Sequence, residues 1–176
     1  MQYYKDFDFN GFWKDDEYSL ANYVEEPPSD ELILEIEQEL GYKLPQSYVA
    51  LMKQHNGGLT HKTCYPMTGH TGWADDHTAI RGIKGIGRIK IYSLCGQAGS
   101  QYMINEWGYP QIGVMICDTP AGGHTIIMLD YRKCGKDGEP EVVLVDEEDN
   151  YSINFVAKDF ETFVRGLVTP DNFTLD

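Results

Sequence analysis

The sequence has no long apolar run, few cysteines and few basic residues. No stretch approaches the about 20 apolar residues that a transmembrane helix needs, and the opening MQYYKDFDF lacks the apolar core of a signal peptide. The four cysteines are far apart and include no C-x-x-C pair, and a chain of 176 residues does not need disulfides to fold. We therefore expect a cytoplasmic protein with reduced thiols and no membrane segment.

The shortage of basic residues constrains the partner. The chain has 14 Lys and Arg against 28 Asp and Glu, a formal net charge of -14. Such a charge argues against binding to nucleic acid or to an anionic membrane, and it favours a basic protein partner. The plain alternative is that the acidity only keeps the protein soluble.

Apolar residues between positions 28 and 58 recur at three- and four-residue steps, which predicts two short helices with one buried face each. Gly41 is suited to end the first helix, and Pro45 fits the first turn of the second. Asn56, Gly57 and Gly58 then end the pair. The buried stripes consist of Leu32, Ile33, Ile36, Leu40, Tyr48, Leu51 and Met52.

The second half of the chain predicts strands joined by short turns and then a closing helix. Two hairpins are expected, one from residues 112–117 and 125–129 and one from residues 141–145 and 151–156. Asp159 can cap the last helix, which follows an i, i+3, i+4, i+7 pattern from Phe160. This order predicts one α+β domain over residues 1–176, with a mostly antiparallel sheet and with the N-terminal helix pair and the C-terminal helix packed on one face. The opposite face and its loops are where we expect the partner.

Residues 1–28 are aromatic and acidic at once, and such a segment is too aromatic for a disordered tail. We expect it to dock on the body of the domain through Phe12, Trp13, Tyr18 and Tyr23. The alternative is that it forms a contact surface for a partner.

Two central segments are harder to interpret. Residues 59–79 contain many turn-forming residues and predict a long exposed loop, packed down by Trp73 and carrying solvated carboxylates and imidazoles, Asp75 and Asp76 among them. Residues 80–94 look strand-like because Ile89 and Ile91 alternate with polar residues. Residues 99–107 predict a short helix with Tyr102, Met103 and Trp107 inward.

Neither segment matches a ligand motif well. The glycines at 82, 85 and 87 reverse the spacing of the dinucleotide fingerprint, and more simply permit tight turns. The histidines and acids of residues 59–79 lack the paired spacing of a zinc site. We expect no metal and no cofactor.

Catalysis would need a nucleophile beside a base, and the nearest approach is Cys117 with His124 across a predicted turn. Because Cys117 lies in a strongly apolar strand, inert packing is the simpler interpretation. Asp118 and Asp130 stand at strand ends, where a carboxylate commonly fixes a turn. Four adjacent acids in the second hairpin turn, Asp146, Glu147, Glu148 and Asp149, are either a solvated loop or an electrostatic contact site.

The chain also resembles a known family. The pattern Glu37-x-x-Leu40-Gly41-x-x-Leu44-Pro45-x-x-Tyr48, followed by Leu51 and Asn56-Gly57-Gly58, is similar to the signature of the SUKH superfamily, the Smi/Knr-like proteins. The resemblance extends more weakly to Asp118, Gly123, Asp130, Phe160 and Phe163. These positions look like core and turn residues, so the resemblance is specific for fold.

The resemblance implies two functions. The first is a cytoplasmic immunity protein, a monomer or weak homodimer, that neutralises a secreted toxin, often a nuclease. The second is a regulatory scaffold linked to cell-wall synthesis, although those proteins carry disordered extensions that we do not expect here. A third hypothesis, from the residues alone, is a small hydrolase using Cys117 or the histidines of residues 59–79. For an immunity protein, we expect Trp73, Asp75, Asp76 and the four acids of the hairpin turn to contact the partner.

Overall fold

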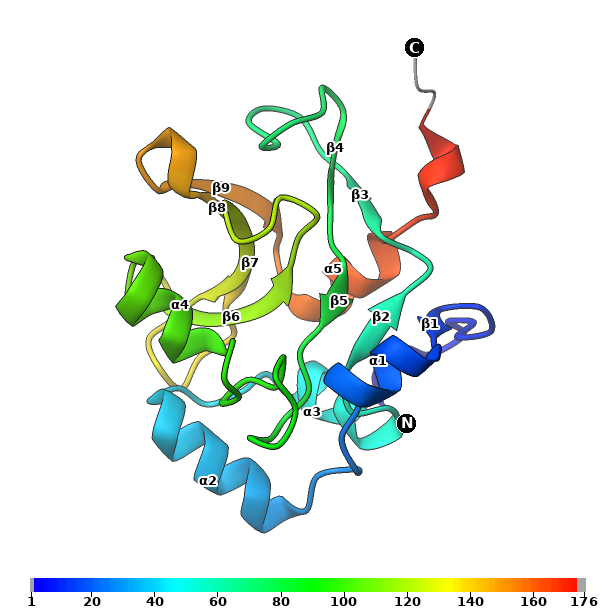
Figure 1. The fold of residues 1–176 in the computed structure, drawn as a ribbon, viewed down its shortest axis with the longest axis vertical. Coiled ribbons are helices and arrows are strands. Elements are labelled where there is room, and N and C mark those ends of the chain that lie inside the picture. The colour runs from blue at the N-terminus through cyan, green and yellow to red at the C-terminus, as the bar shows by residue number, and fades with distance from the viewer. Residues whose placement is uncertain (1, 174–176) are drawn as a thin grey trace.

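The computed structural model describes residues 2–173, and its centre is a seven-stranded sheet in the order β1-β2-β5-β6-β7-β8-β9, with antiparallel pairing throughout (Figure 1). The strands are β1 (Trp13–Lys14), β2 (Gly58–Thr60), β5 (Gly82–Ile83), β6 (Gly113–Asp118), β7 (Thr125–Asp130), β8 (Glu141–Asp146) and β9 (Ser152–Ala157). A separate hairpin pairs β3 (Cys64–Pro66) with β4 (His77–Ala79). The helices are α1 (Glu17–Asn22), α2 (Asp30–Leu40), α3 (Gln46–Gln54), α4 (Ser100–Trp107) and α5 (Phe160–Gly166), with 3-10 turns η1 (Glu147–Asp149) and η2 (Pro170–Asn172). The α+β prediction with a mostly antiparallel sheet is confirmed.

Both faces of the central strands are covered, which explains why their sequences are almost continuously apolar. Along β7, Ile127 and Leu129 face the larger core while Ile126 and Met128 face a second, smaller one. A β-bulge between Met115 and Cys117 shifts the register of β6 against β7.

The larger core contains the apolar residues of α2, α3 and α5, so these helices pack on one face as predicted. Ile36, Leu51 and Phe163 represent the three helices in it, and all are fully buried. α4 instead packs on the opposite face through Met103. The face expected to be free for a partner is therefore partly covered.

The signature residues around Gly41 are explained by backbone hydrogen bonds. Gly41 adopts a left-handed conformation (φ 84°) as the C-cap of α2, and its N–H donates to the Glu37 carbonyl. The Glu37 carboxylate then accepts the Leu44 N–H at 2.7 Å, across the connection to α3. Pro45 is the N-cap of α3, one residue before the helix begins.

The Asn56-Gly57-Gly58 motif does more than end α3. Asn56 is buried, and its side chain bonds to the backbone of both Glu26 and Ile86. A Cβ at Gly57 would lie 2.6 Å from the Gly85 nitrogen, so the two backbones touch at this point. The motif therefore joins α3 to residues 84–99.

The N-terminal segment docks on the body as expected. Tyr4, Phe12 and Tyr23 are buried, and a chain of edge-to-face ring contacts runs from Tyr4 to Trp13. Tyr18, however, is 42% exposed, so its predicted packing is wrong. It is placed outward by the short helix α1, which buries Ser19 instead.

Two central predictions are also wrong. Residues 59–79 do not form one exposed loop, because they contain β2, β3 and β4, and β3 and β4 pair with each other. Residues 80–94 contain only the two-residue strand β5, and Ile89, expected to lie in a strand, lies outside it and is 85% exposed. A buried network holds this segment in an irregular path, with the Ser93 hydroxyl donating to the Glu25 carboxylate and the Ile86 N–H donating to Asn56.

Within residues 2–173, no helix has the length and the apolar character that crossing a bilayer requires.

Candidate partner-binding surface

The turn between β8 and β9 carries the four predicted acids, but only some of them face solvent. Asp146 is buried, and its Oδ1 accepts the Glu148 N–H at 3.0 Å as the N-cap of η1. Glu147 is half-buried, while Glu148 and Asp149 are exposed. The prediction that Asp146 contacts a partner is therefore corrected, because this carboxylate is used to shape the turn.

A histidine joins this turn to the loop between β3 and β4. His70 Nε2 lies 2.7 Å from Asp146 Oδ2 and 3.8 Å from Asp149 Oδ2. The loop approaches the sheet closely at Gly72, where a Cβ would lie 3.1 Å from the Thr125 methyl group. Two segments that are 76 residues apart in sequence thus form one surface.

A second histidine joins the acidic turn to the turn between β6 and β7. His124 Nδ1 lies 2.9 Å from Glu147 Oε2 and 3.7 Å from Glu148 Oε1. The Glu147 N–H also donates to the His124 carbonyl at 2.9 Å. The hydrogen bond to Glu147, helped by the charge of Glu148, raises the pKa of His124.

Trp73 is the main apolar group on this surface. Its side chain is 60% exposed, so the expectation that it packs the loop down is wrong. The loop is held instead by the Thr71 hydroxyl, which donates to the Ala74 carbonyl, and by stacking of His77 on Phe173 at 3.9 Å between ring centroids. His77 is consequently buried rather than solvated.

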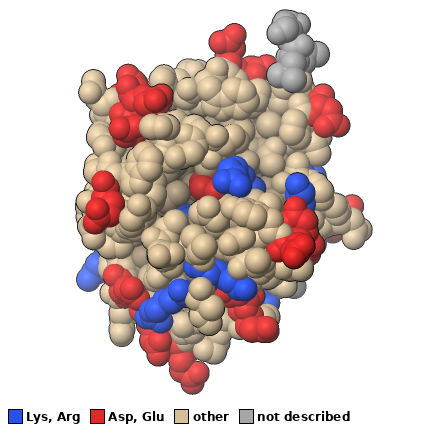
Figure 2. Space-filling model, viewed as in Figure 1, with Lys and Arg blue, Asp and Glu red and all other residues tan. Residues whose placement is uncertain are grey.

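Asp75 and Asp76 lie between Trp73 and β4, and both are exposed. Asp76 Oδ1 is 2.7 Å from His77 Nδ1. We use the name acidic rim for the exposed and half-exposed acids Asp75, Asp76, Glu147, Glu148 and Asp149. Both loops project at the upper edge of Figure 1, and Figure 2 shows acidic groups gathered at the upper left, over the β8–β9 turn.

Asp118 and Asp130 have different roles. Asp130 is buried, and it accepts the Arg132 N–H at 3.0 Å and binds the Arg132 guanidinium, as expected for a turn-fixing carboxylate. Burial would raise the pKa of Asp130, but the bonds to Arg132 outweigh burial and lower it. Asp118 accepts the Tyr23 hydroxyl at 2.6 Å rather than a turn N–H.

The turn after Asp118 is held by the next residue instead. The Thr119 hydroxyl donates to the Thr125 carbonyl at 2.9 Å and accepts the Ala121 N–H at 3.3 Å. Gly123 has a φ of 100°, and a Cβ there would lie 3.0 Å from the Trp107 ring. Gly123 therefore permits both the turn and its packing on α4.

Cys117 is not arranged for catalysis. Its side chain is fully buried in the larger core, and burial raises the pKa of its thiol well above the usual value. His124 is paired with Glu147 rather than with the thiol. Across residues 2–173 all four cysteines are free, and no three His, Cys, Asp or Glu side chains are grouped closely enough to hold a metal ion.

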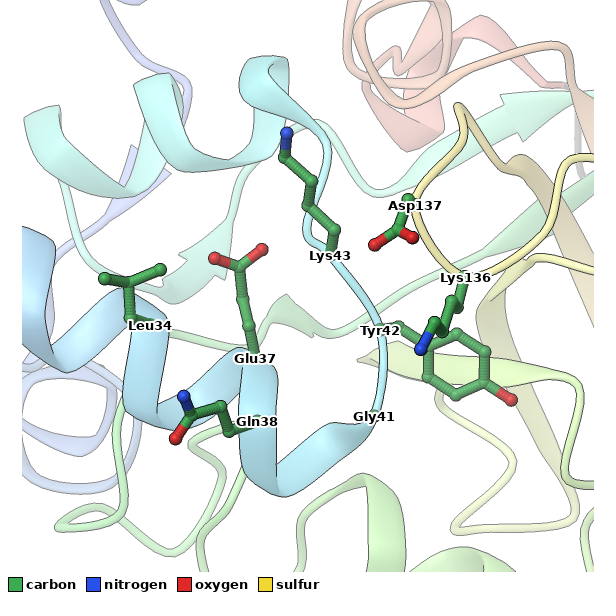
Figure 3. A pocket seen from close by; sticks show the side chains of 8 residues that line it. All are labelled: Leu34, Glu37, Gln38, Gly41, Tyr42, Lys43, Lys136 and Asp137. Atoms are coloured by element: carbon green, nitrogen blue, oxygen red, sulfur yellow. The ribbon is translucent and has the colours of Figure 1, made fainter.

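A pocket of about 420 Å³ lies beside the signature residues of α2 (Figure 3). Leu34, Glu37 and Gln38 line it from α2, and Lys136 and Asp137 from the facing segment. The Glu37 carboxylate is engaged by the Leu44 N–H, and the Lys43 N–H donates to the Lys136 carbonyl at 2.8 Å. The Glu37 carboxylate and the Lys136 carbonyl in this pocket therefore already have hydrogen-bond partners, and they connect backbone segments of the protein.

The comparisons with known proteins identify the family. The family model SUKH_6, described as SMI1-KNR4 cell-wall, matches residues 30–164. The chain belongs to the SUKH superfamily. The matched range runs from the start of α2 into α5, and it contains every signature residue proposed from the sequence. A search of curated proteins found no match.

The sequence anticipated the acidic turn but not what surrounds it. His70 and His124 were not predicted to pair with the acids, and no local pattern indicates such contacts. The sequence also did not predict that Arg81, Lys84 and Tyr92 come together beside Asp118.

Proposed function

We propose that this SUKH-superfamily protein is a non-enzymatic immunity protein that binds a basic toxin domain, such as a nuclease, and blocks it by direct contact. The observation that carries the proposal is the acidic rim itself. Carboxylates from two distant loops are held together through His70, with Trp73 exposed beside them. Aromatic residues such as Trp are enriched at the centre of protein interfaces, while polar and charged residues surround them at the border.

Charge complementarity supports a toxin that acts on nucleic acid. A nuclease presents a basic groove to phosphates, so a protein with a net charge of -14 is attracted to that groove. Association of this kind is fast at low salt and weakens as salt rises, because ions screen exposed charges beyond about 10 Å at 0.1 M.

The absence of catalysis is part of the proposal. Cys117 is the most plausible nucleophile in the sequence, and its buried, protonated thiol is a poor one. The proposal also places the protein in the cytoplasm, where an immunity protein meets a toxin that has entered the cell and where its thiols stay reduced.

Co-expression with the toxin encoded beside its gene tests the proposal. We expect the protein to rescue growth and to co-purify with the toxin at low salt. Unchanged killing together with no co-purification would refute it. Measuring toxin activity on its substrate with the purified protein added would show whether the block needs only contact.

The second candidate is a regulatory scaffold, favoured by the cell-wall description of the family model. It predicts a stable partner among the cell's own wall-synthesis proteins rather than a toxin. Loss of the gene would then change sensitivity to wall-directed antibiotics in cells that encode no cognate toxin. An immunity protein predicts no such change.

A further inference from the structure

A cleft of about 240 Å³ opens beside Asp118, on the face of the sheet that carries α4. Its walls come from α4, from residues 81–98, from β6 and from the turn after it. In Figure 2 a hollow is visible near the centre of this face, with basic and acidic groups at its border. The cleft is separate from the acidic rim.

Lys84 lines this cleft, and its position is unusual for a lysine. Its side chain has no exposed surface, and its Nζ donates one hydrogen bond, to the Ala98 carbonyl at 2.9 Å. An ammonium has three N–H groups to satisfy. The Tyr92 ring lies 5.2 Å from Nζ, and the negative charge of Asp118 favours the charged form of Lys84, but within residues 2–173 no carboxylate forms a direct ion pair with it. Burial lowers the pKa of Lys84, which reflects the cost of keeping this charge from water.

Asp118 contributes a second unsatisfied group. Its Oδ2 accepts the Tyr23 hydroxyl, but its Oδ1 is buried and has no donor within the described residues. Arg81 stands nearby, with Nη1 3.9 Å from Asp118 Oδ2 and its side chain 41% exposed. The cleft thus has two cations and one carboxylate, in a protein whose overall charge is strongly negative.

We propose that this cleft binds a small carboxylic acid that carries an N–H or O–H donor on the carbon next to the carboxylate, as in an α-amino or α-hydroxy acid. The carboxylate accepts hydrogen bonds from Lys84 and Arg81, and the adjacent donor bonds to Asp118 Oδ1. Each unsatisfied group then gains a partner of the opposite kind. A single anion without the donor would leave the Asp118 oxygen unpaired, which is costly in a buried position.

The remaining walls fit the body of such a ligand. Trp107, Met103 and Met115 supply apolar surface, and Tyr92 supplies an aromatic face. The volume lies below the about 300–1,000 Å³ of pockets for drug-sized molecules, so the ligand is of amino-acid size. Lys84 already lines the cleft, and the half-buried Tyr92 ring lies 5.2 Å from its Nζ, beside the position proposed for the carboxylate.

Titration with four related probes tests the proposal. L-phenylalanine and L-phenyllactate have both features, L-phenylalaninamide lacks the carboxylate, and 3-phenylpropionate lacks the donor. Binding is measured from NMR chemical shifts of the cleft residues at millimolar probe. We expect at least one of the first two to shift Trp107 and Met115, and each of the last two to bind about tenfold more weakly or not at all.

Two variants test whether binding depends on the cleft rather than on surface charge in general. Lys84→Met keeps the length and the apolar stem of the buried side chain, and Arg81→Gln removes the charge of a side chain that is 41% exposed. Each should reduce affinity about tenfold, whereas Arg88→Gln, which removes a cation paired with Glu39 outside the cleft, should not change it. Thermal melts confirm that each variant is folded. The proposal would be overturned if no probe shifted the cleft resonances, or if both cleft variants bound the probes as well as the parent protein does. Ordered water would then be the partner of Lys84.

Discussion

The side chain of Asn56 forms two hydrogen bonds with the backbone of Ile86, as a residue of a neighbouring strand would. Its Nδ2 donates to the Ile86 carbonyl at 2.9 Å, and its Oδ1 accepts the Ile86 N–H at 2.7 Å. A third bond runs from Nδ2 to the Glu26 carbonyl at 2.8 Å. One side chain therefore holds three segments together, namely the chain before α2, the end of α3 and the irregular residues 84–99.

Replacing Asn56 should be costly. Asn56→Ala leaves the N–H and carbonyl of Ile86 and the carbonyl of Glu26 without their partner, and a buried polar group left unpaired costs about 1–3 kcal/mol. We expect the free energy of unfolding to fall by at least about 2 kcal/mol, measured by urea denaturation. Asn172→Ala is the matched control, because that amide is exposed and bonds only within its own turn. Equal effects of the two substitutions would show that Asn56 is not a structural clamp.

Leu51 tests the buried face of α3. Its side chain is fully buried in the larger core, so Leu51→Ala should destabilise the protein by about 2–5 kcal/mol. Leu34 is on the outer face of α2 with 61% of its side chain exposed, and Leu34→Ala should change stability by less than about 0.5 kcal/mol. Thermal and urea unfolding of both variants measure the difference. A small effect at Leu51 would mean that the helix pair is not packed as described.

The acidic rim should affect binding without affecting stability. The triple variant Glu147→Gln, Glu148→Gln, Asp149→Asn removes three negative charges while leaving the buried Asp146 cap in place. We expect weaker binding to the toxin and a shallower dependence of affinity on salt, measured by calorimetry at several salt concentrations. The melting temperature should stay close to that of the parent protein.

A control tests whether the net charge of the protein, rather than the acidic rim, attracts the partner. A control variant with Glu17→Gln, Glu31→Gln and Asp137→Asn also removes three charges, from exposed positions outside the rim. If both triple variants weaken binding equally, the overall acidity and not the rim attracts the partner. If the rim variant destabilises the protein and leaves binding unchanged, the proposed division between core and surface is refuted.

His124 should titrate above the ordinary histidine pKa of about 6.5, because Glu147 and Glu148 favour its charged form. A group whose pKa is raised by folding stabilises the protein fully below its unfolded pKa, and this contribution is lost as the pH rises through the folded pKa. The stabilisation is small because the imidazole is exposed. An NMR titration of the ring protons gives the pKa, and Glu147→Gln should lower it. A pKa at or below 6.5 in the parent protein would contradict the contact with Glu147.

Strong periodicity made much of the fold predictable. The stripes through Ile36 and Leu51, the apolar runs of β6 to β8 and the cap at Asp159 each reflect local geometry, and each lies where the sequence places it. The strand predicted for residues 80–94 was wrong because distant partners such as Asn56 and Glu25 fix the path of this segment and override its local propensity. The alternation of Ile89 and Ile91 was therefore misleading.

The candidate surface was only partly predictable for the same reason. Adjacent acids are visible in a sequence, so the β8–β9 turn was identified. The pairing of His70 with Asp146 depends on how the loop of the β3–β4 hairpin packs against the sheet. A single sequence contains no signal for that packing. Trp73 is conspicuous in the sequence, but its exposure follows from Thr71 and His77, which fix the loop in its place.

The two edges of the sheet differ in what they offer to another chain. β1 closes one edge with two residues, whereas the outer side of β9 runs for six residues with no strand beside it in the described part of the chain. Unpaired N–H and C=O groups along such an edge are a template for strand addition, and the exposed Phe155 adds apolar area there. Self-association at high concentration should therefore begin at β9, where two copies can extend each other's sheet without disturbing either core.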